Sequence, residues 1–176
     1  MNRELRTILA LALAFAPLGC KQAKTVHVQQ TEEEAPRLAS VVHVADPKVE
    51  PQLVSGFYGV EGKAWRWTAK QFTVVLRVPA GAAERGATLD LALSVPQVTI
   101  DKLQTVSLFV TVDGHALPPE TYTTSGQFDY KRDVAPGMLA NQSARLEFHL
   151  DKAMPPANGD QRELGVIVSS AGLEVK

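Results

Sequence analysis

The sequence predicts an all-β protein, an antiparallel β-sandwich of the jelly-roll type. Apolar and polar residues alternate in several segments, which is the pattern of strands with one buried and one solvent-facing side. Turn-forming pairs such as Asp113-Gly114 and Asn158-Gly159 separate these segments. Because no window carries a sustained helical stripe, about eight short strands at this spacing favour a sandwich over a helical fold.

The composition fits one globular domain with appendages. The chain has 176 residues, of which 45% are hydrophobic and 21% are charged, as in ordinary folded proteins. The formal net charge is −1, and the sequence contains no block of lysine and arginine. Nucleic acid is therefore not expected among the partners, because its binding depends on clustered positive charge.

The first 20 residues predict export. Arg3 and Arg6 give the chain a positive start, and residues 8–16 form an uninterrupted apolar run. A helix that spans a bilayer needs about 20 residues, so this run is too short to be one. A positive start followed by an apolar stretch of about 7–15 residues is typical of a secretory signal peptide.

Residues 16–20, Ala-Pro-Leu-Gly-Cys, resemble the lipobox of bacterial lipoproteins. In that family a small residue precedes the cysteine, which receives a diacylglyceryl group and becomes the new N-terminus after cleavage. The resemblance implies a signal peptide over residues 1–19, acyl chains such as palmitate on Cys20, and the lipid bilayer as a partner. In Gram-negative sorting an aspartate after the cysteine holds lipoproteins at the inner membrane. Lys21 stands there instead, which implies an extracytoplasmic protein of the outer membrane.

The lipobox departs from the family's pattern at one position, because Pro17 occupies the place that leucine most often takes. One alternative is simple secretion, with cleavage after Ala16. That cut would put Pro17 directly behind the cleaved bond, where its locked ring suits a protease poorly. Another alternative is an uncleaved membrane anchor. Cys20 is the only cysteine, so no internal disulfide and no cysteine-rich metal site are expected.

A polar tether is expected to precede a globular domain that covers residues 38–176. Residues 20–37 are rich in Lys, Gln, Thr and Glu and cannot bury enough apolar surface to order themselves. The valine-rich segment 41–44 predicts a strand, which the prolines that follow restrict to a short piece or an edge. Asp113-Gly114 predicts a hairpin between its flanking strands. Residues 164–175 predict a strand that closes the sheet.

Four segments show the clearest alternation. In each of them every second residue is apolar and is expected to face the core, while the residues between them face solvent. The expected core residues are Phe72, Val74, Leu76 and Val78; Leu89, Leu91, Leu93 and Val95; Val106, Leu108, Val110 and Val112; and Leu146, Phe148 and Leu150.

Two arginine-centred motifs stand out from this pattern. The first, residues 56–68, reads Gly-Phe-Tyr-Gly-Val-Glu-Gly-Lys-Ala-Trp-Arg-Trp-Thr and holds both tryptophans of the protein. The second, residues 155–166, contains the run Asp-Gln-Arg-Glu-Leu-Gly. The central arginines, Arg66 and Arg162, each have acidic neighbours in the sequence.

Together the two motifs resemble a bacterial β-sandwich module that occurs in extracytoplasmic proteins and appended to some glycosyltransferases. That module begins with a Gly-aromatic-Glu…Arg-Trp segment and closes on an Asp-x-Arg-x-Leu-Gly strand, and the match covers about residues 54–175. Since its members mostly lack assigned biochemistry, the resemblance implies the fold and, by context alone, a carbohydrate-related role.

The motifs allow a functional interpretation. Trp65, Trp67 and Tyr58 would form an aromatic platform for a sugar ring, whose apolar C–H face suits stacking. Charged groups that offer several hydrogen bonds would bind the sugar hydroxyls. The candidates for this contact are Glu61, Arg66, Asp160 and Arg162.

The alternative interpretation of the same residues is structural. One tryptophan would fill the core, and Glu61 would hold Arg66. Asp160 or Glu163 would hold Arg162, so that the charged pairs join the first strand of the sandwich to the last. In both interpretations, alternation puts the tryptophans on one face of a strand and the arginine between them on the other. The structural interpretation is favoured, because such residues in strands more often stabilise a fold than form a site.

No enzyme signature accompanies the motifs. The four histidines are scattered, and no nucleotide-binding, P-loop or nucleophile motif occurs. Glu61 and Asp160 would act as a glycosidase pair only at a separation that the sequence does not give. We therefore expect no cofactor and no metal, and a non-catalytic envelope lipoprotein that binds a ligand, with glycan as the first class. The alternatives are an assembly lipoprotein that docks on another envelope protein and, third, a glycan hydrolase.

Overall fold

The computed structural model describes residues 38–176. The predicted signal peptide, the lipidation site Cys20 and the predicted tether lie outside these residues. Within them, no helix is both long enough and apolar enough to cross a membrane. The strands are β1 (Val41–His43), β2 (Leu53–Glu61), β3 (Trp65–Arg77), β4 (Ala87–Val95), β5 (Val106–Val112), β6 (His115–Tyr122), β7 (Gly126–Val134), β8 (Ser143–Leu150) and β9 (Ile167–Val175). The helical segments are η1 (Pro47–Gln52), α1 (Ala82–Arg85), α2 (Gln97–Leu103) and η2 (Pro136–Met138).

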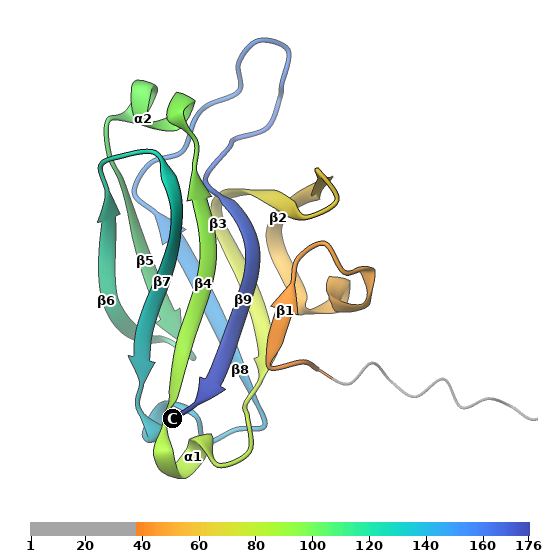
Figure 1. The fold of residues 1–176 in the computed structure, drawn as a ribbon, viewed down its shortest axis with the longest axis vertical. Coiled ribbons are helices and arrows are strands. Elements are labelled where there is room, and N and C mark those ends of the chain that lie inside the picture. The colour runs from red at the N-terminus through yellow and green to blue at the C-terminus, as the bar shows by residue number, and fades with distance from the viewer. Residues whose placement is uncertain (1–37) are drawn as a thin grey trace, which may run out of the picture. The chain divides into compact units, whose positions relative to one another are not determined.

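The strands form two packed layers (Figure 1). One layer has the order β1-β9-β4-β7 and the other has the order β3-β8-β5-β6, with antiparallel neighbours throughout. β2 is added beside β3. β3 belongs to both layers, because Arg66 and Trp67 pair with β9 whereas residues 71–77 pair with β8. This strand order is that of a jelly roll and confirms the predicted fold class.

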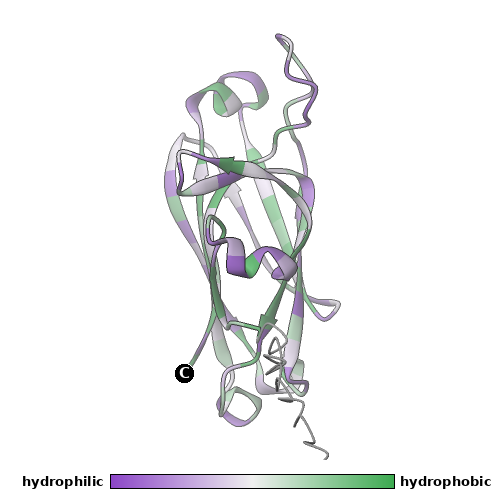
Figure 2. Cartoon of the chain, turned by 90° about the vertical axis from the view of Figure 1, so that its right-hand side faces the viewer, coloured by the Kyte–Doolittle hydropathy of each residue, from purple (hydrophilic) through white to green (hydrophobic). Residues whose placement is uncertain are grey.

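The core lies between the two layers and is built from the alternating segments. In β4 every second residue from Ala87 to Val95 is buried, and β8 follows the same period. Figure 2 shows the alternation as successive apolar and polar bands along the strands. Phe72 of β3 stacks on Phe148 of β8, with 4.7 Å between the ring centroids. All predicted core residues are confirmed except Val78, which is half-buried just beyond the end of β3.

The shorter elements agree with the prediction in part. Asp113-Gly114 joins β5 to β6 in a tight hairpin, since Val112 pairs with His115. β1 has three residues and pairs only with β9, and β9 also pairs with β3 and β4, which closes the sheet as expected. The helices α1 and α2 were not predicted. They have four and seven residues, which is too short to produce a helical stripe in the sequence.

Side chains rather than strand pairing close the gap between β6 and β7. Pro118 and Pro119 of β6 have no N–H to donate. The Pro118 carbonyl oxygen accepts hydrogen bonds from Tyr130 Oη at 2.8 Å and from Arg132 Nε at 3.0 Å. Arg132 also donates to the Pro119 carbonyl oxygen at 3.1 Å and pairs with Glu120 at 2.7 Å. Backbone groups that would otherwise attract another strand are therefore occupied at this edge.

Candidate functional site

The hairpin between β2 and β3 sets the position of Trp65. Gly62 and Lys63 at its turn both adopt left-handed backbone conformations, with φ of 57° and 58°. The Ala64 amide closes the turn on the Glu61 carbonyl oxygen at 3.2 Å. A Cβ on Gly62 would lie 2.7 Å from Nε1 of Trp65. The indole therefore packs directly against the glycine backbone, which holds the ring at the start of β3.

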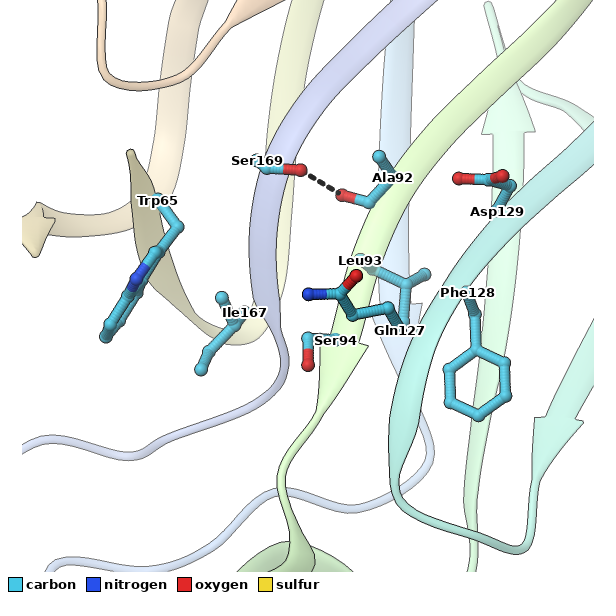
Figure 3. Close-up of a pocket in the computed structure, with 9 residues that line it drawn as sticks. All are labelled: Trp65, Ala92, Leu93, Ser94, Gln127, Phe128, Asp129, Ile167 and Ser169. Carbon is cyan, nitrogen blue, oxygen red and sulfur yellow. Dashed lines mark hydrogen bonds between the residues drawn. The ribbon is translucent and has the colours of Figure 1, made fainter. Parts of the chain in front are cut away.

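Trp65 forms one wall of a groove on the outer face of the β9-β4-β7 layer (Figure 3). The groove has a volume of about 330 Å³. Its floor consists of outward-facing residues in register: Ser94 of β4 pairs with Ile167 of β9 and with Gln127 of β7. Asp129 follows on the same face of β7, two residues further along. The groove is lined by Trp65, Ala92, Leu93, Ser94, Gln127, Phe128, Asp129, Ile167 and Ser169.

The polar groups of the groove differ in how they are bonded. The hydroxyl of Ser94 donates to the Gly126 carbonyl oxygen at 3.1 Å, and the hydroxyl of Ser169 donates to a β4 carbonyl oxygen at 3.4 Å. Gln127 and Asp129 are exposed, and their side chains make no hydrogen bond to any other described residue. An amide and a carboxylate thus face a half-buried indole across a shallow groove, with hydroxyls between them.

Neither tryptophan lies in the core. Trp65 and Trp67 are half-buried and face outward, whereas Arg66 and Thr68 are buried on the inner side of β3. The predicted separation of the tryptophans from Arg66 is confirmed, and the interpretation that one tryptophan fills the core is wrong. Trp67 pairs directly with Ile167, a groove residue, so it stands next to the groove without lining it.

Arg66 is a buried structural residue, and the prediction that Glu61 binds it is wrong. Its Nε donates to the Val44 carbonyl oxygen at 2.7 Å, and its Nη1 donates to the Tyr58 carbonyl oxygen at 3.2 Å. Its ion pair is with Glu50 of η1 and not with Glu61. The difference arises because β3 turns this arginine inward, toward the gap between β1 and β2, where η1 lies. Arg66 is therefore not available to a ligand in the groove.

Arg162 binds both acidic residues of the predicted site, Glu61 and Asp160. Its Nε and Nη2 donate to Asp160, the latter at 2.8 Å, and its Nη1 donates to Glu61 at 2.8 Å. The guanidinium carbon lies 5.3 Å from the centroid of the Tyr58 ring. Hydrogen bonding from Arg162 lowers the pKa of Asp160 to about 2, and the two carboxylates raise the pKa of Arg162 further above its ordinary value. Of the two partners expected for Arg162, Asp160 is confirmed.

The two motifs meet around this arginine. The hydroxyl of Tyr58 donates to the Glu163 carbonyl oxygen at 2.8 Å, which adds a second link between β2 and the loop 151–166. At the end of the loop a Cβ on Gly165 would lie 2.7 Å from the Ala69 carbonyl oxygen, so the backbone passes β3 too closely for a side chain. The motifs therefore join the β2–β3 hairpin to the segment that leads into β9.

Asp160 does not have the properties of the general acid in a glycosidase pair. Glu61 and Asp160 both accept hydrogen bonds from one guanidinium, and a general acid in glycoside hydrolysis needs a raised pKa, whereas Asp160 has a lowered one. Among residues 38–176, no three His, Cys, Asp or Glu side chains lie close enough together to hold a metal ion.

Sequence reasoning missed most of the groove. It singled out Trp65 but none of the residues of β4, β7 and β9 that face it. The alternation of β4 had placed Ser94 on the solvent side, but which strands flank β4 depends on the order of strands in the sheet. The missed polar residues of the groove are Ser94, Gln127, Asp129 and Ser169.

Comparison with known proteins gives distant structural neighbours only. No known family model matches the sequence, and no curated protein matches it either. A family GH115 4-O-methyl-α-glucuronidase with specificity for decorated arabinogalactans superposes with a TM-score of 0.43 at 14% identity. The superposition covers 80% of this chain and 18% of that chain, so this chain spans less than a fifth of that enzyme's length.

Two carbohydrate-binding modules are similar over their whole length. Carbohydrate-binding module CBM36 in complex with calcium and xylotriose gives a TM-score of 0.42 at 7% identity, covering 76% of this chain and 98% of that one. The family 35 module from Clostridium thermocellum gives 0.43 at 10% identity, covering 77% and 98%. The assignment of the jelly roll rests on the strand pairing of this chain itself.

Proposed function

We propose that this chain is a membrane-anchored envelope protein whose β-sandwich binds glycan in the Trp65 groove without hydrolysing it. The observation that carries the proposal is the half-buried indole of Trp65, which faces the unengaged side chains of Gln127 and Asp129 across the β9-β4-β7 layer. A sugar presents an apolar C–H face and a rim of hydroxyls. An aromatic wall opposite planar polar groups complements both.

The size and charge of the groove support binding over catalysis. Its volume of about 330 Å³ lies at the small end of ligand pockets, which span roughly 300–1,000 Å³. Asp129 is the only carboxylate that lines it, whereas glycoside hydrolysis generally uses a pair of carboxylates. With no cationic side chain among the lining residues, the groove suits neutral sugars better than uronates.

Docking on another protein through the β6 edge of the sheet is less well supported. Strand addition needs free backbone donors and acceptors at an edge. At β6 two residues are prolines, and their carbonyl oxygens already accept hydrogen bonds from Arg132 and Tyr130. The groove is a binding surface that does not depend on such an edge.

A glycan array probed with the full-length chain tests the proposal. We expect retention on one or more glycan classes, followed by measurable binding in isothermal titration calorimetry. Trp65→Ala should weaken that binding about tenfold, because an aromatic contact contributes about 0.5–1.5 kcal/mol beyond the buried area. Phe109→Ala is the matched control, since Phe109 is 45% exposed on β5, in the other layer. No retention on any glycan, or equal binding by wild type and Trp65→Ala, would contradict the proposal.

The anchoring part of the proposal rests on the lipobox-like segment and has its own test. Cells that express the full chain are fed an alkyne analogue of palmitate and then fractionated. We expect label on the wild-type protein in the membrane fraction and none on Cys20→Ala. Label on both proteins or on neither would remove Cys20 as the anchor and leave glycan binding untouched.

A further inference from the structure

A second aromatic hollow lies beside the groove. Trp67 contributes to a space of about 190 Å³ between β3, α2 and the loop 151–166. Lys102 of α2 and, from the loop, Asp160 and Arg162 are the charged residues that also line it. Trp67 is half-buried, like Trp65, so part of its ring is accessible from this hollow.

The groove and the hollow are each lined by a tryptophan of β3. Trp65 and Trp67 are two residues apart on β3 and face the same side, so their Cβ atoms lie about 7 Å apart. Trp67 pairs directly with Ile167, which lines the groove, and side chains in such a pair are in contact range. A ligand that leaves the groove past Ile167 therefore meets Trp67 next.

The loop that forms the far wall of the hollow is held in place. An isolated bridge joins Met154 to Leu164, and a second joins Ala157 to Asp160. Arg162 then connects the loop to Glu61 at the end of β2. The second motif thus positions the hollow against β3, and its residues Asp160 and Arg162 line the hollow but not the groove.

We infer that Trp67 forms a second subsite and that the ligand is an extended neutral glycan chain that spans both aromatic residues. This inference rests on the proposed function. Two indoles on one face of a strand match successive rings of a chain whose sugar units lie flat. β-1,4-linked chains have this ribbon-like shape. The groove, with Asp129 and no cation, favours units without a carboxylate. In the hollow, Arg162 already binds Asp160 and Glu61, so Lys102 is the one lining cation without a carboxylate partner among the described residues.

Titration with cello-oligosaccharides and chito-oligosaccharides, from the monosaccharide to the hexasaccharide, tests the inference on the full-length chain. We expect affinity in one series to rise with length. Trp67→Ala should lower hexasaccharide affinity about tenfold and change disaccharide affinity less than twofold. Trp65→Ala should weaken both. Trp67→Phe, which keeps an aromatic ring, should retain most of the gain with length, and Phe109→Ala serves as the surface control.

The outcomes separate the inference from the proposed function. If the wild-type chain binds oligosaccharides through Trp65 but affinity does not rise with length, the second subsite is wrong and the groove stands. The same holds if Trp67→Ala affects all lengths equally or none. If neither series binds although the array shows retention on another glycan, the β-1,4-linked class is wrong. If no glycan binds in any format, the proposed function itself fails.

Discussion

Arg162 and Glu61 are 101 residues apart in the chain, yet Nη1 of Arg162 donates to the Glu61 carboxylate at 2.8 Å. The other side of the same guanidinium binds Asp160. One cation therefore connects the end of β2 to the loop 151–166. Because Trp65 follows Glu61 in the same hairpin and Trp67 faces the loop, this connection sets how the two aromatic residues stand relative to the loop.

Arg162→Ala should loosen the loop 151–166 more than it destabilises the whole domain. The side chains of this network are each about one third exposed, so we expect the free energy of unfolding to fall by only about 1 kcal/mol. Hydrogen exchange should accelerate at the amides of Asp160 and Leu164, which donate within the loop. Arg145→Ala is the control, since its pair with Glu147 is half exposed. Loss of folding, or unchanged exchange in the loop, would contradict this role.

The Asp160–Arg162 contact predicts a specific dependence of stability on pH. The folded-state pKa of Asp160 is lowered to about 2, below the ordinary value of 3.8, because Arg162 binds its carboxylate. The contribution to stability is therefore fully present above about pH 4 and is lost as the pH falls toward 2. The difference in Tm between wild type and Asp160→Asn should be constant from pH 7 to about pH 4 and then shrink. If the difference in Tm is the same at pH 2 as at pH 7, the charge of the Asp160 carboxylate does not stabilise the fold.

Arg66 should matter far more for stability than its ion-pair partner. Arg66→Leu removes the donors from the Val44 and Tyr58 carbonyl oxygens, so we expect a loss of about 2–4 kcal/mol in urea unfolding. Glu50→Gln should cost less than about 1 kcal/mol, because the Glu50 side chain is 59% exposed. Equal effects of the two substitutions would mean that the ion pair, and not the backbone contacts, carries the stability.

The fold could be predicted because burial follows sequence alternation in the strands that are covered on one side. In β4, Leu89, Leu91 and Leu93 face the core and small or polar residues face out, so the period of two is visible. α2 could not be predicted in this way. It buries only Thr99, and a helix of seven residues leaves no stripe.

The sequence could predict only those features of the candidate site that depend on a single strand. Alternation shows that Trp65 and Trp67 share a face, but it does not show which face, because Arg66 and Thr68 are polar and still buried. Arg66 and Thr68 point inward because their side chains donate hydrogen bonds to backbone carbonyl oxygens. The partners of Trp65 come from β4, β7 and β9, and their proximity depends on strand order, which no local pattern encodes.

Two core tyrosines should respond oppositely to loss of the hydroxyl. Tyr130→Phe removes a hydrogen bond of 2.8 Å to the Pro118 carbonyl oxygen and should cost about 0.5–1.5 kcal/mol. The Tyr122 hydroxyl is buried and has no partner among the described residues, so Tyr122→Phe should be neutral or stabilising by up to about 1 kcal/mol. Urea unfolding of the two variants checks this pair. A marked loss of stability in Tyr122→Phe would indicate a partner for that hydroxyl.

Burial also predicts how the two tyrosines affect stability in alkali. It raises the pKa of Tyr130 to about 12 and raises that of Tyr122 as well. Both groups stay neutral in the folded state at a pH where the unfolded chain ionises. Ionisation therefore favours the unfolded state, and the stability of the fold decreases as the pH rises above 10. Tyr122→Phe should reduce the fall in Tm between pH 9 and pH 11, and an unchanged fall would contradict the burial of this hydroxyl.

Gly62 should control the orientation of Trp65 without affecting Trp67. A Cβ at Gly62 would meet Nε1 of Trp65 at 2.7 Å, and the left-handed backbone there adds strain for any other residue, about 1 kcal/mol. The protein has two tryptophans, so its ¹H–¹⁵N spectrum has two indole resonances. Gly62→Ala should shift the Trp65 resonance and weaken glycan binding. Gly59→Ala is the matched control, because a Cβ at Gly59 in β2 has nothing within 4 Å. If Gly59→Ala shifts the same resonance as strongly, or if Gly62→Ala moves both resonances alike, the turn does not hold the indole.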